Sequence, residues 1–112
     1  RLEEIIQRTR DGGAEIVKLL KTGSAFYAPG VSAIEMAESI LKNQKKILPC
    51  CTYANGEYEI ADQFLGLPVI LSSKGVEKII EIELTKDEQQ ELAVSASHVN
   101  ELCNFIDESG LI

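Results

Sequence analysis

Apolar residues recur at helical spacing through the first twenty positions of the chain, in two sets that a pair of glycines separates. The two sets are Leu2, Ile5, Ile6 and Ile16, Val17, Leu19, Leu20. Each glycine inside a helix costs about 1 kcal/mol relative to alanine, so Gly12 and Gly13 predict either a bend or a close approach by another group. A packing bend, as one kinked helix or two abutting helices, is the simpler expectation. Because glycine commonly follows a helical C-terminus, Thr22-Gly23-Ser24 is expected to end this segment.

A second helix is expected after a loop that runs through Tyr27. Pro29 suits the first turn of a helix, where its missing N–H costs nothing. The apolar stripe that follows, down to about Lys42, consists of Ile34, Ala37, Ile40 and Leu41. The polar run 42–46 then predicts a solvated connection.

Short apolar runs bounded by turn residues predict strands in the middle of the chain. The expected strands are 47–53, 57–60, 67–72 and 76–80. Pro49 favours an edge strand, because it cannot donate to a ladder. Asn55-Gly56 is a strong hairpin signal, and 73–75 reads as a tight turn.

Thr85 and Glu88 form a capping box that starts a long final helix. Its expected buried face consists of Leu92, Ser95, Val99, Leu102, Cys103 and Ile106. The order of helix, helix, three or four strands and helix indicates an α+β fold, in which helices pack on a small antiparallel sheet. Residues 1–112 are expected to form a single domain.

The charge balance narrows the class of partner. The 112 residues carry 11 Lys and Arg against 18 Asp and Glu, a net charge of −7. Nucleic acid is therefore not expected as a partner, because phosphate contacts need clustered basic residues. No apolar run approaches the roughly 20 residues that cross a bilayer, and residues 1–4 do not resemble a signal peptide, so a soluble protein is expected. The first helix has no cap, which suggests that the chain begins inside an element.

The three cysteines indicate a reducing, cytoplasmic location. Cys50, Cys51 and Cys103 are odd in number and fit neither a disulfide framework nor metal-ligand spacing. Adjacent cysteines in a strand point to opposite faces. Buried thiols are the expected state.

The residues alone predict no complete active site and no metal site. His98 has no orienting partner at helical spacing, and no Gly-rich phosphate loop follows a strand. Alternating acids such as Glu57 and Glu59 read as a solvated face. Arg8 and Arg10 could clamp an anion, although pairing within the helix is the simpler expectation. A binding module and one part of a larger enzyme fit these residues equally well.

Several segments of the chain closely resemble the C-terminal half of malate dehydrogenases of the bacterial, lactate-dehydrogenase-like type. They are residues 8–17 (RTRDGGAEIV), 23–29 (GSAFYAP), 49–51, 66–70, 74–79 and 84–103. The segment 23–29 resembles malate-type members in particular, because lactate enzymes usually place Thr where Ala25 stands.

The resemblance implies an NAD-dependent enzyme of the tricarboxylic acid cycle that interconverts malate and oxaloacetate by hydride transfer. The chain would be the C-terminal portion of its catalytic domain. The nucleotide-binding domain and the catalytic residues would lie upstream of Arg1, so this chain would hold no catalytic residue and would be inactive alone.

The resemblance also implies roles for three residues. Ser24 and Ala25 would line the substrate pocket, and Pro29 would contact the NAD cofactor. The alternative is an ordinary connector between helices, and Gly30-Val31 departs from the more common Ala-Ala.

The helix at about 30–42 would pack at a subunit interface of a homodimer or homotetramer, unless its stripe faces its own core. The competing hypotheses for the whole chain are an autonomous binding or oligomerisation module without catalysis, and the same domain of a lactate dehydrogenase.

Overall fold

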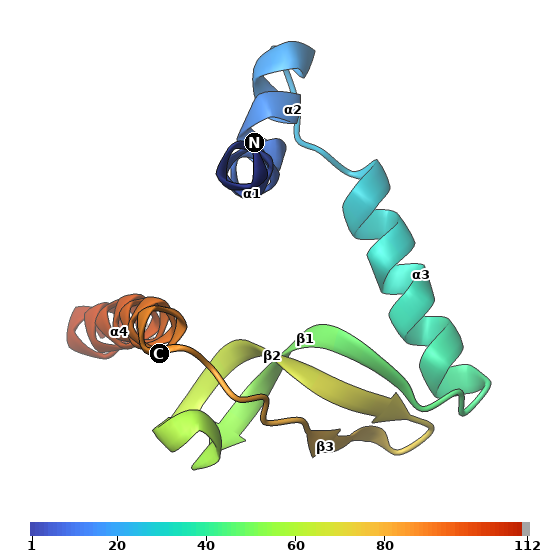
Figure 1. Ribbon diagram of the computed structural model, residues 1–112, viewed down its shortest axis with the longest axis vertical. Helices are drawn as coiled ribbons and strands as arrows, with labels where there is room; N and C mark the ends of the chain where they lie inside the picture. Colours follow the sequence, from blue (N-terminus) through green and yellow to red (C-terminus); the bar gives the residue numbers. More distant parts are fainter. Residues whose placement is uncertain (111–112) are drawn as a thin grey trace. The chain divides into compact units, whose positions relative to one another are not determined.

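The computed structural model describes residues 1–110, which form four α-helices, three strands and one 3-10 turn (Figure 1). The elements are α1 Leu2–Arg10, α2 Gly12–Leu20, α3 Tyr27–Leu41, β1 Lys46–Asn55, η1 Glu57–Glu59, β2 Ala61–Ser72, β3 Gly75–Ile79 and α4 Lys86–Ser109. Residues 1–37 and 38–112 form two compact units. The α+β prediction is confirmed, with a sheet that is wholly antiparallel.

In the first unit, the expected break near the double glycine is present as two abutting helices. α1 and α2 meet at Asp11, whose side chain accepts a hydrogen bond of 3.0 Å from the Gln7 amide. α2 ends at Leu20, before the expected Thr22-Gly23-Ser24. Lys21, the residue that follows the helix, has a positive φ of 61°, although glycine is the residue that was expected at the helix end.

α3 begins at Tyr27, the residue through which the preceding loop was expected to run. Pro29 does lie in its first turn, as predicted. The predicted apolar stripe of this helix is only partly shielded from solvent, because Ile40 is half-buried whereas Ile34 and Leu41 are exposed.

The sheet has the strand order β1-β2-β3, so β1, which carries Pro49, lies at an edge, as predicted. The central strand β2 also contains a proline, Pro68. The hairpin after Asn55 is also confirmed, since Asn55 pairs with Ala61. The predicted strand 57–60 is wrong: residues 57–59 form the 3-10 turn η1. Tyr58 has a left-handed φ of 54°, and its backbone N–H donates to the Glu81 carboxylate at 3.0 Å.

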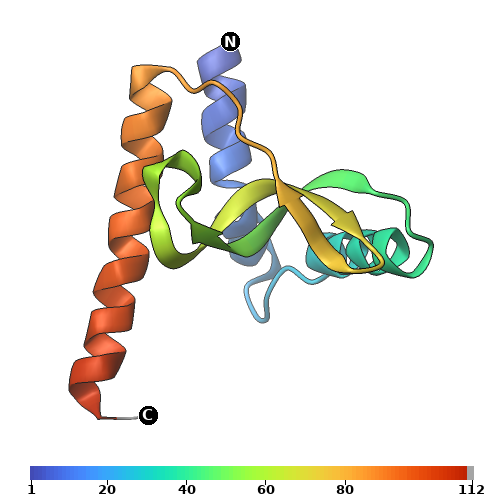
Figure 2. The ribbon, with the colours of Figure 1, turned by 90° about the horizontal axis from the view of Figure 1, so that it is seen from below.

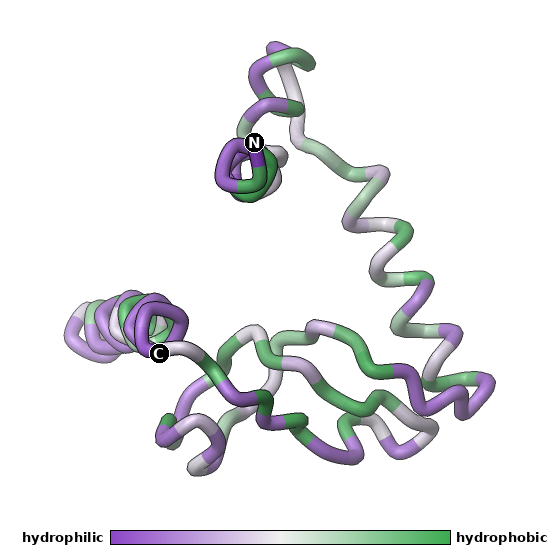
Figure 3. Tube along the Cα trace, viewed as in Figure 1, coloured by the Kyte–Doolittle hydropathy of each residue, from purple (hydrophilic) through white to green (hydrophobic). Residues whose placement is uncertain are grey.

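The core lies on one face of the sheet, here called the inner face. Burial alternates along β1 and β2, as expected for strands with one covered face. Ala54, Leu65 and Leu67 pack there against Ala96 of α4. In Figure 3 much of the sheet is nevertheless coloured hydrophobic, because apolar residues stand at exposed as well as at buried strand positions.

The capping box of α4 is present as predicted, but most of the expected buried face is not buried. Leu92 and Val99 are half-buried, whereas the other predicted positions are exposed. Those positions are Ser95, Leu102, Cys103 and Ile106. A helix of 24 residues is about 36 Å long, and its second half extends past the sheet (Figure 2).

The cysteines are free, and two of the three contradict the expected burial. Cys50 is buried on the inner face, and desolvation raises the pKa of its thiol. Cys51 faces the opposite way, as predicted for adjacent strand residues, and is exposed, as is Cys103 on α4. None of the helices within residues 1–110 is long and apolar enough to cross a membrane.

Candidate functional site

The loop between α2 and α3 carries two of the predicted site residues, Ser24 and Ala25, and the first turn of α3 carries the third, Pro29. Its path is set by two positive backbone angles, at Lys21 (φ 61°) and Gly23 (φ 95°). The N–H of Gly30 donates to the carbonyl of Phe26 at 2.9 Å, which closes the first turn of α3. Pro29 fits in that turn because the first N–H groups of a helix have no intrahelical acceptor.

Two of the predicted residues are open to solvent, and the third is partly covered. Ser24 and Ala25 lie in the irregular segment before α3, where Ser24 is exposed and Ala25 is half-buried. Pro29 is exposed on the first turn of α3. The three lie within six consecutive positions, so one wall of a pocket could contain them all.

An aromatic pair in the same loop was missed by the sequence reasoning. The rings of Phe26 and Tyr27 have centroids 4.6 Å apart and are 63% and 80% exposed. They are two of only six aromatic residues in the chain, and their adjacency between small residues was an available signal. Such exposed rings can cover an apolar or aromatic ligand surface.

Arg8 is committed to a neighbouring carboxylate and does not act as an open anion clamp. Its Nε and Nη2 donate to the two carboxylate oxygens of Glu15 at 3.2 and 3.0 Å, across the break between α1 and α2. The hydrogen bonds raise the pKa of Arg8 and lower that of Glu15. The pairing expected within one helix therefore joins two helices.

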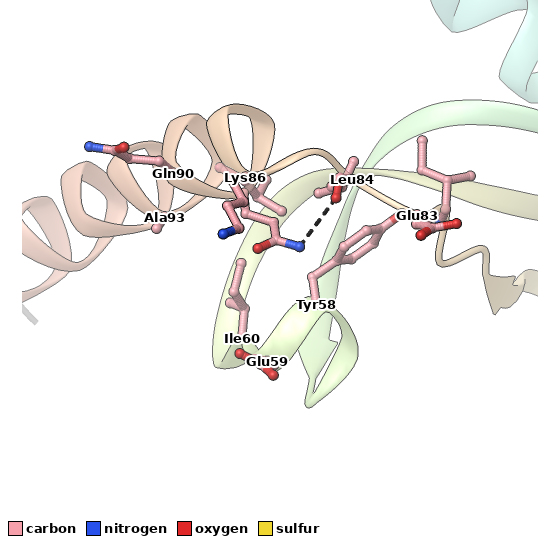
Figure 4. A pocket seen from close by; sticks show the side chains of 11 residues that line it. Tyr58, Glu59, Ile60, Glu83, Leu84, Lys86, Gln90 and Ala93 are labelled. Carbon is pink, nitrogen blue, oxygen red and sulfur yellow. Dashed lines mark hydrogen bonds between the residues drawn. The ribbon is translucent and has the colours of Figure 1, made fainter.

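The second unit holds a separate cavity of about 610 Å³ between η1, the segment after β3 and the start of α4 (Figure 4). Tyr58 shapes it, because its hydroxyl donates to the Ile80 carbonyl at 2.7 Å and accepts from the Ile82 N–H at 3.0 Å. The Gln89 amide donates to the Leu84 carbonyl at 3.2 Å. The lining residues include Glu59, Glu83 and Lys86 but no Ser, Cys or His, so the cavity holds no serine or cysteine nucleophile beside an imidazole base.

The remaining candidates also form no catalytic arrangement. His98 is exposed on α4. Within residues 1–110, no three side chains of His, Cys, Asp or Glu gather where they could hold a metal ion.

The comparison with protein families shows which family the chain belongs to. Residues 1–108 match the lactate/malate dehydrogenase, alpha/beta C-terminal domain family. The chain belongs to the lactate/malate dehydrogenase family. It matches the C-terminal domain of that family, as the resemblance of its motifs predicted.

Solved structures of both branches of the family are similar to the chain. Malate dehydrogenase from Salinibacter ruber is 50% identical with a TM-score of 0.89, over 97% of this chain and 37% of that one. Malate dehydrogenase from Cryptosporidium parvum is 42% identical with a TM-score of 0.92, over 95% of this chain and 34% of that one. Lactate dehydrogenase from Eimeria maxima, solved with NADH and oxamate, is 38% identical with a TM-score of 0.86, over 99% of this chain and 36% of that one.

The chain therefore spans little more than a third of the length of these dehydrogenases. All three of these solved structures are of dehydrogenases, which are oxidoreductases.

Proposed function

We propose that the chain is the C-terminal part of an NAD-dependent malate dehydrogenase that interconverts malate and oxaloacetate. The observation that carries the proposal is the segment Gly23–Pro29, which resembles malate-type members and has Ala25 where lactate enzymes usually have Thr. The 50% identity to a malate dehydrogenase is consistent with it.

The contribution of this chain is to shape a pocket. The methyl group of Ala25 is the smallest side chain beyond glycine, so it leaves room for the second carboxylate of a dicarboxylate. Ser24 beside it adds a hydroxyl that can donate to or accept from a polar substrate atom. Pro29, in the first turn of α3, would lie against the cofactor.

The residues of this chain fit NAD only as one side of its binding site. Between Gly23 and Pro29 the side chains are small, apolar or aromatic, and none is charged at neutral pH, so they suit the flat nicotinamide ring better than the pyrophosphate. NAD, when bound, supplies the hydride acceptor. The base for the hydroxyl proton and the groups that hold the phosphates would belong to a nucleotide-binding domain on the same polypeptide, outside residues 1–112.

A cytoplasmic location and a homodimer or homotetramer complete the proposal. Free cysteines suit a reducing compartment. Exposed apolar residues of α3, such as Val31 and Ile34, suit a subunit contact through that helix.

The decisive experiment measures NADH consumption by the protein at the length that its native source makes, with oxaloacetate and with pyruvate as separate substrates. We expect a higher kcat/KM for oxaloacetate. Replacing Ala25 with Thr should lower the preference for oxaloacetate over pyruvate, whereas Ala28→Thr, three residues away on α3, is the matched control.

A preference for pyruvate would instead support the lactate dehydrogenase reading, which the 38% identity to the Eimeria maxima enzyme keeps as a second candidate. If a polypeptide of only about 12 kDa is found in the source, in place of one of roughly 300 residues and two domains, the enzymatic proposal fails in favour of an autonomous binding module.

A further inference from the structure

Asn55 and Gly56, at the turn that joins β1 to β2, form the one Asn-Gly pair of the chain (Figure 1). An asparagine followed by glycine can lose ammonia without a catalyst, because glycine has no Cβ to shield the backbone nitrogen that attacks the side-chain amide. Both residues are exposed, and within residues 1–110 the Asn55 side chain forms no hydrogen bond. The Asn55 amide can therefore react whenever the backbone brings the Gly56 nitrogen to it.

The other three asparagines of the chain are less suited to this reaction. Asn43 precedes Gln44, and its Oδ1 accepts from the N–H and the hydroxyl of Ser73 at 3.1 Å each. Asn100 and Asn104 lie inside α4, where the helical hydrogen bonds engage the nitrogen of each following residue. Sequence and structure thus single out Asn55.

The reaction proceeds in two steps and needs no oxidant or reductant. The Gly56 nitrogen bonds to Cγ of Asn55, the Cγ–Nδ2 bond breaks, and Nδ2 leaves as ammonia with the proton that the Gly56 nitrogen gives up. One water molecule then opens the five-membered succinimide ring. Attack of water at Cγ leaves aspartate, whereas attack at the former main-chain carbonyl leaves isoaspartate. Each product carries a new carboxylate.

The closed hairpin holds the two reacting atoms apart. Asn55 is the last residue of β1 and pairs with Ala61, and the extended ψ of a strand turns the next nitrogen away from the side-chain carbonyl. The Gly56 N–H also donates to the Ile60 carbonyl at 2.8 Å, so its proton is engaged. The reaction therefore requires the tip of the hairpin to open locally.

A carboxylate in the turn helps to keep the tip closed. The Asn55 N–H donates to Oε2 of Glu57 at 2.7 Å, and this hydrogen bond lowers the pKa of Glu57. Glu59 lies two residues further on and is exposed, and its side chain forms no hydrogen bond within residues 1–110. Glu57 and Glu59 therefore offer a matched pair, in which only Glu57 makes this contact.

We propose that Asn55 is a spontaneous deamidation site of the folded protein, and that opening of the hairpin tip at Gly56 sets the rate. Either product adds a negative charge to a turn that already carries Glu57 and Glu59. Isoaspartate also lengthens the main chain by one atom, so the pairing of residue 55 with Ala61 is lost. The modification is irreversible, so it accumulates with each opening of the tip that leads to reaction.

The test incubates the protein at its native length in a mildly alkaline buffer, folded and unfolded in guanidinium chloride, and follows its peptides by chromatography and mass spectrometry. In the folded protein residue 55 should convert before residues 43, 100 and 104, and the aspartate and isoaspartate products should separate. In the unfolded protein the conversion should be at least about tenfold faster, because the ladder pair and the Gly56 hydrogen bond no longer oppose it. Asn55→Gln keeps an amide but needs a six-membered ring, so it should abolish the early product.

The two glutamates separate the hydrogen bond from the charge. Glu57→Ala removes the acceptor of the Asn55 N–H and should speed the conversion in the folded protein about fivefold, the factor that the loss of one ordinary hydrogen bond produces. Glu59→Ala removes the same charge from the same turn without breaking that contact, so it should leave the rate close to that of the parent protein.

The proposal is overturned if residue 55 does not convert in the folded protein, or if residue 43, 100 or 104 converts before it. Equal rates in the folded and unfolded protein would also overturn it, as would equal rates for Glu57→Ala and Glu59→Ala. None of these outcomes depends on which substrate the protein takes.

Discussion

Ser39 is the single buried residue of α3, and its hydroxyl links the end of that helix to the sheet. We therefore predict that Ser39→Ala lowers the free energy of unfolding. It is fully buried; its Oγ donates to the Leu71 carbonyl at 2.7 Å and accepts from the Lys46 N–H at 3.3 Å. Ser39→Ala removes both hydrogen bonds, although Lys46 and Leu71 remain paired with each other in the β1–β2 ladder. A typical intramolecular hydrogen bond contributes about 0.5–1.5 kcal/mol, so the loss of two predicts a decrease of about 2 kcal/mol in the free energy of unfolding.

Urea unfolding followed by circular dichroism measures this loss. With a slope of about 2 kcal/mol per molar urea, the midpoint should fall by about 1 M. The matched control is Ser32→Ala, an exposed serine of the same helix, which should change stability by less than about 0.5 kcal/mol. Equal midpoints for the two variants would refute the reasoning, as would unchanged hydrogen exchange at the Lys46 amide.

Three further predictions concern the loss of helicity at low pH, the exposed apolar surface of α1 and α2, and the turnover of malate. The pKa of Glu88 is lowered because its carboxylate accepts from the Thr85 N–H and hydroxyl, so its contribution is present above the unfolded pKa and is lost as the pH falls through the folded one. Glu88→Gln should therefore reduce the loss of helicity in an acid titration below about pH 5. The exposed apolar residues of α1 and α2 should make the isolated chain dimerise or bind a hydrophobic dye, and a dye-silent monomer would contradict this. With NAD and malate the isolated chain should give no change in absorbance, and turnover that survives repurification would disprove the assignment of the catalytic groups to another domain.

Local interactions made much of the fold readable from the sequence. The capping box at Thr85, the hairpin after Asn55 and the edge position of Pro49 each follow from short-range rules, because the groups involved are neighbours along the chain or within one strand pair. The break between α1 and α2 was predictable for the same reason. The resemblance of several segments, from residues 8–17 to residues 84–103, identified the family before any geometry was known. Residues 23–29 added the hypothesis that Ser24, Ala25 and Pro29 belong to its ligand site.

Long-range contacts decided the features that the sequence left open or indicated wrongly. Residues 57–60 alternate like a strand, but the hydroxyl and N–H of Tyr58 bond to residues more than twenty positions away, and these bonds hold a left-handed turn. Periodicity in α4 marked a continuous apolar stripe, yet burial is confined to the turns that lie over β2, because the helix is longer than the sheet that it covers. Whether a residue is buried depends on what lies opposite it, and for Cys51 only the three-dimensional arrangement of the strands decided that.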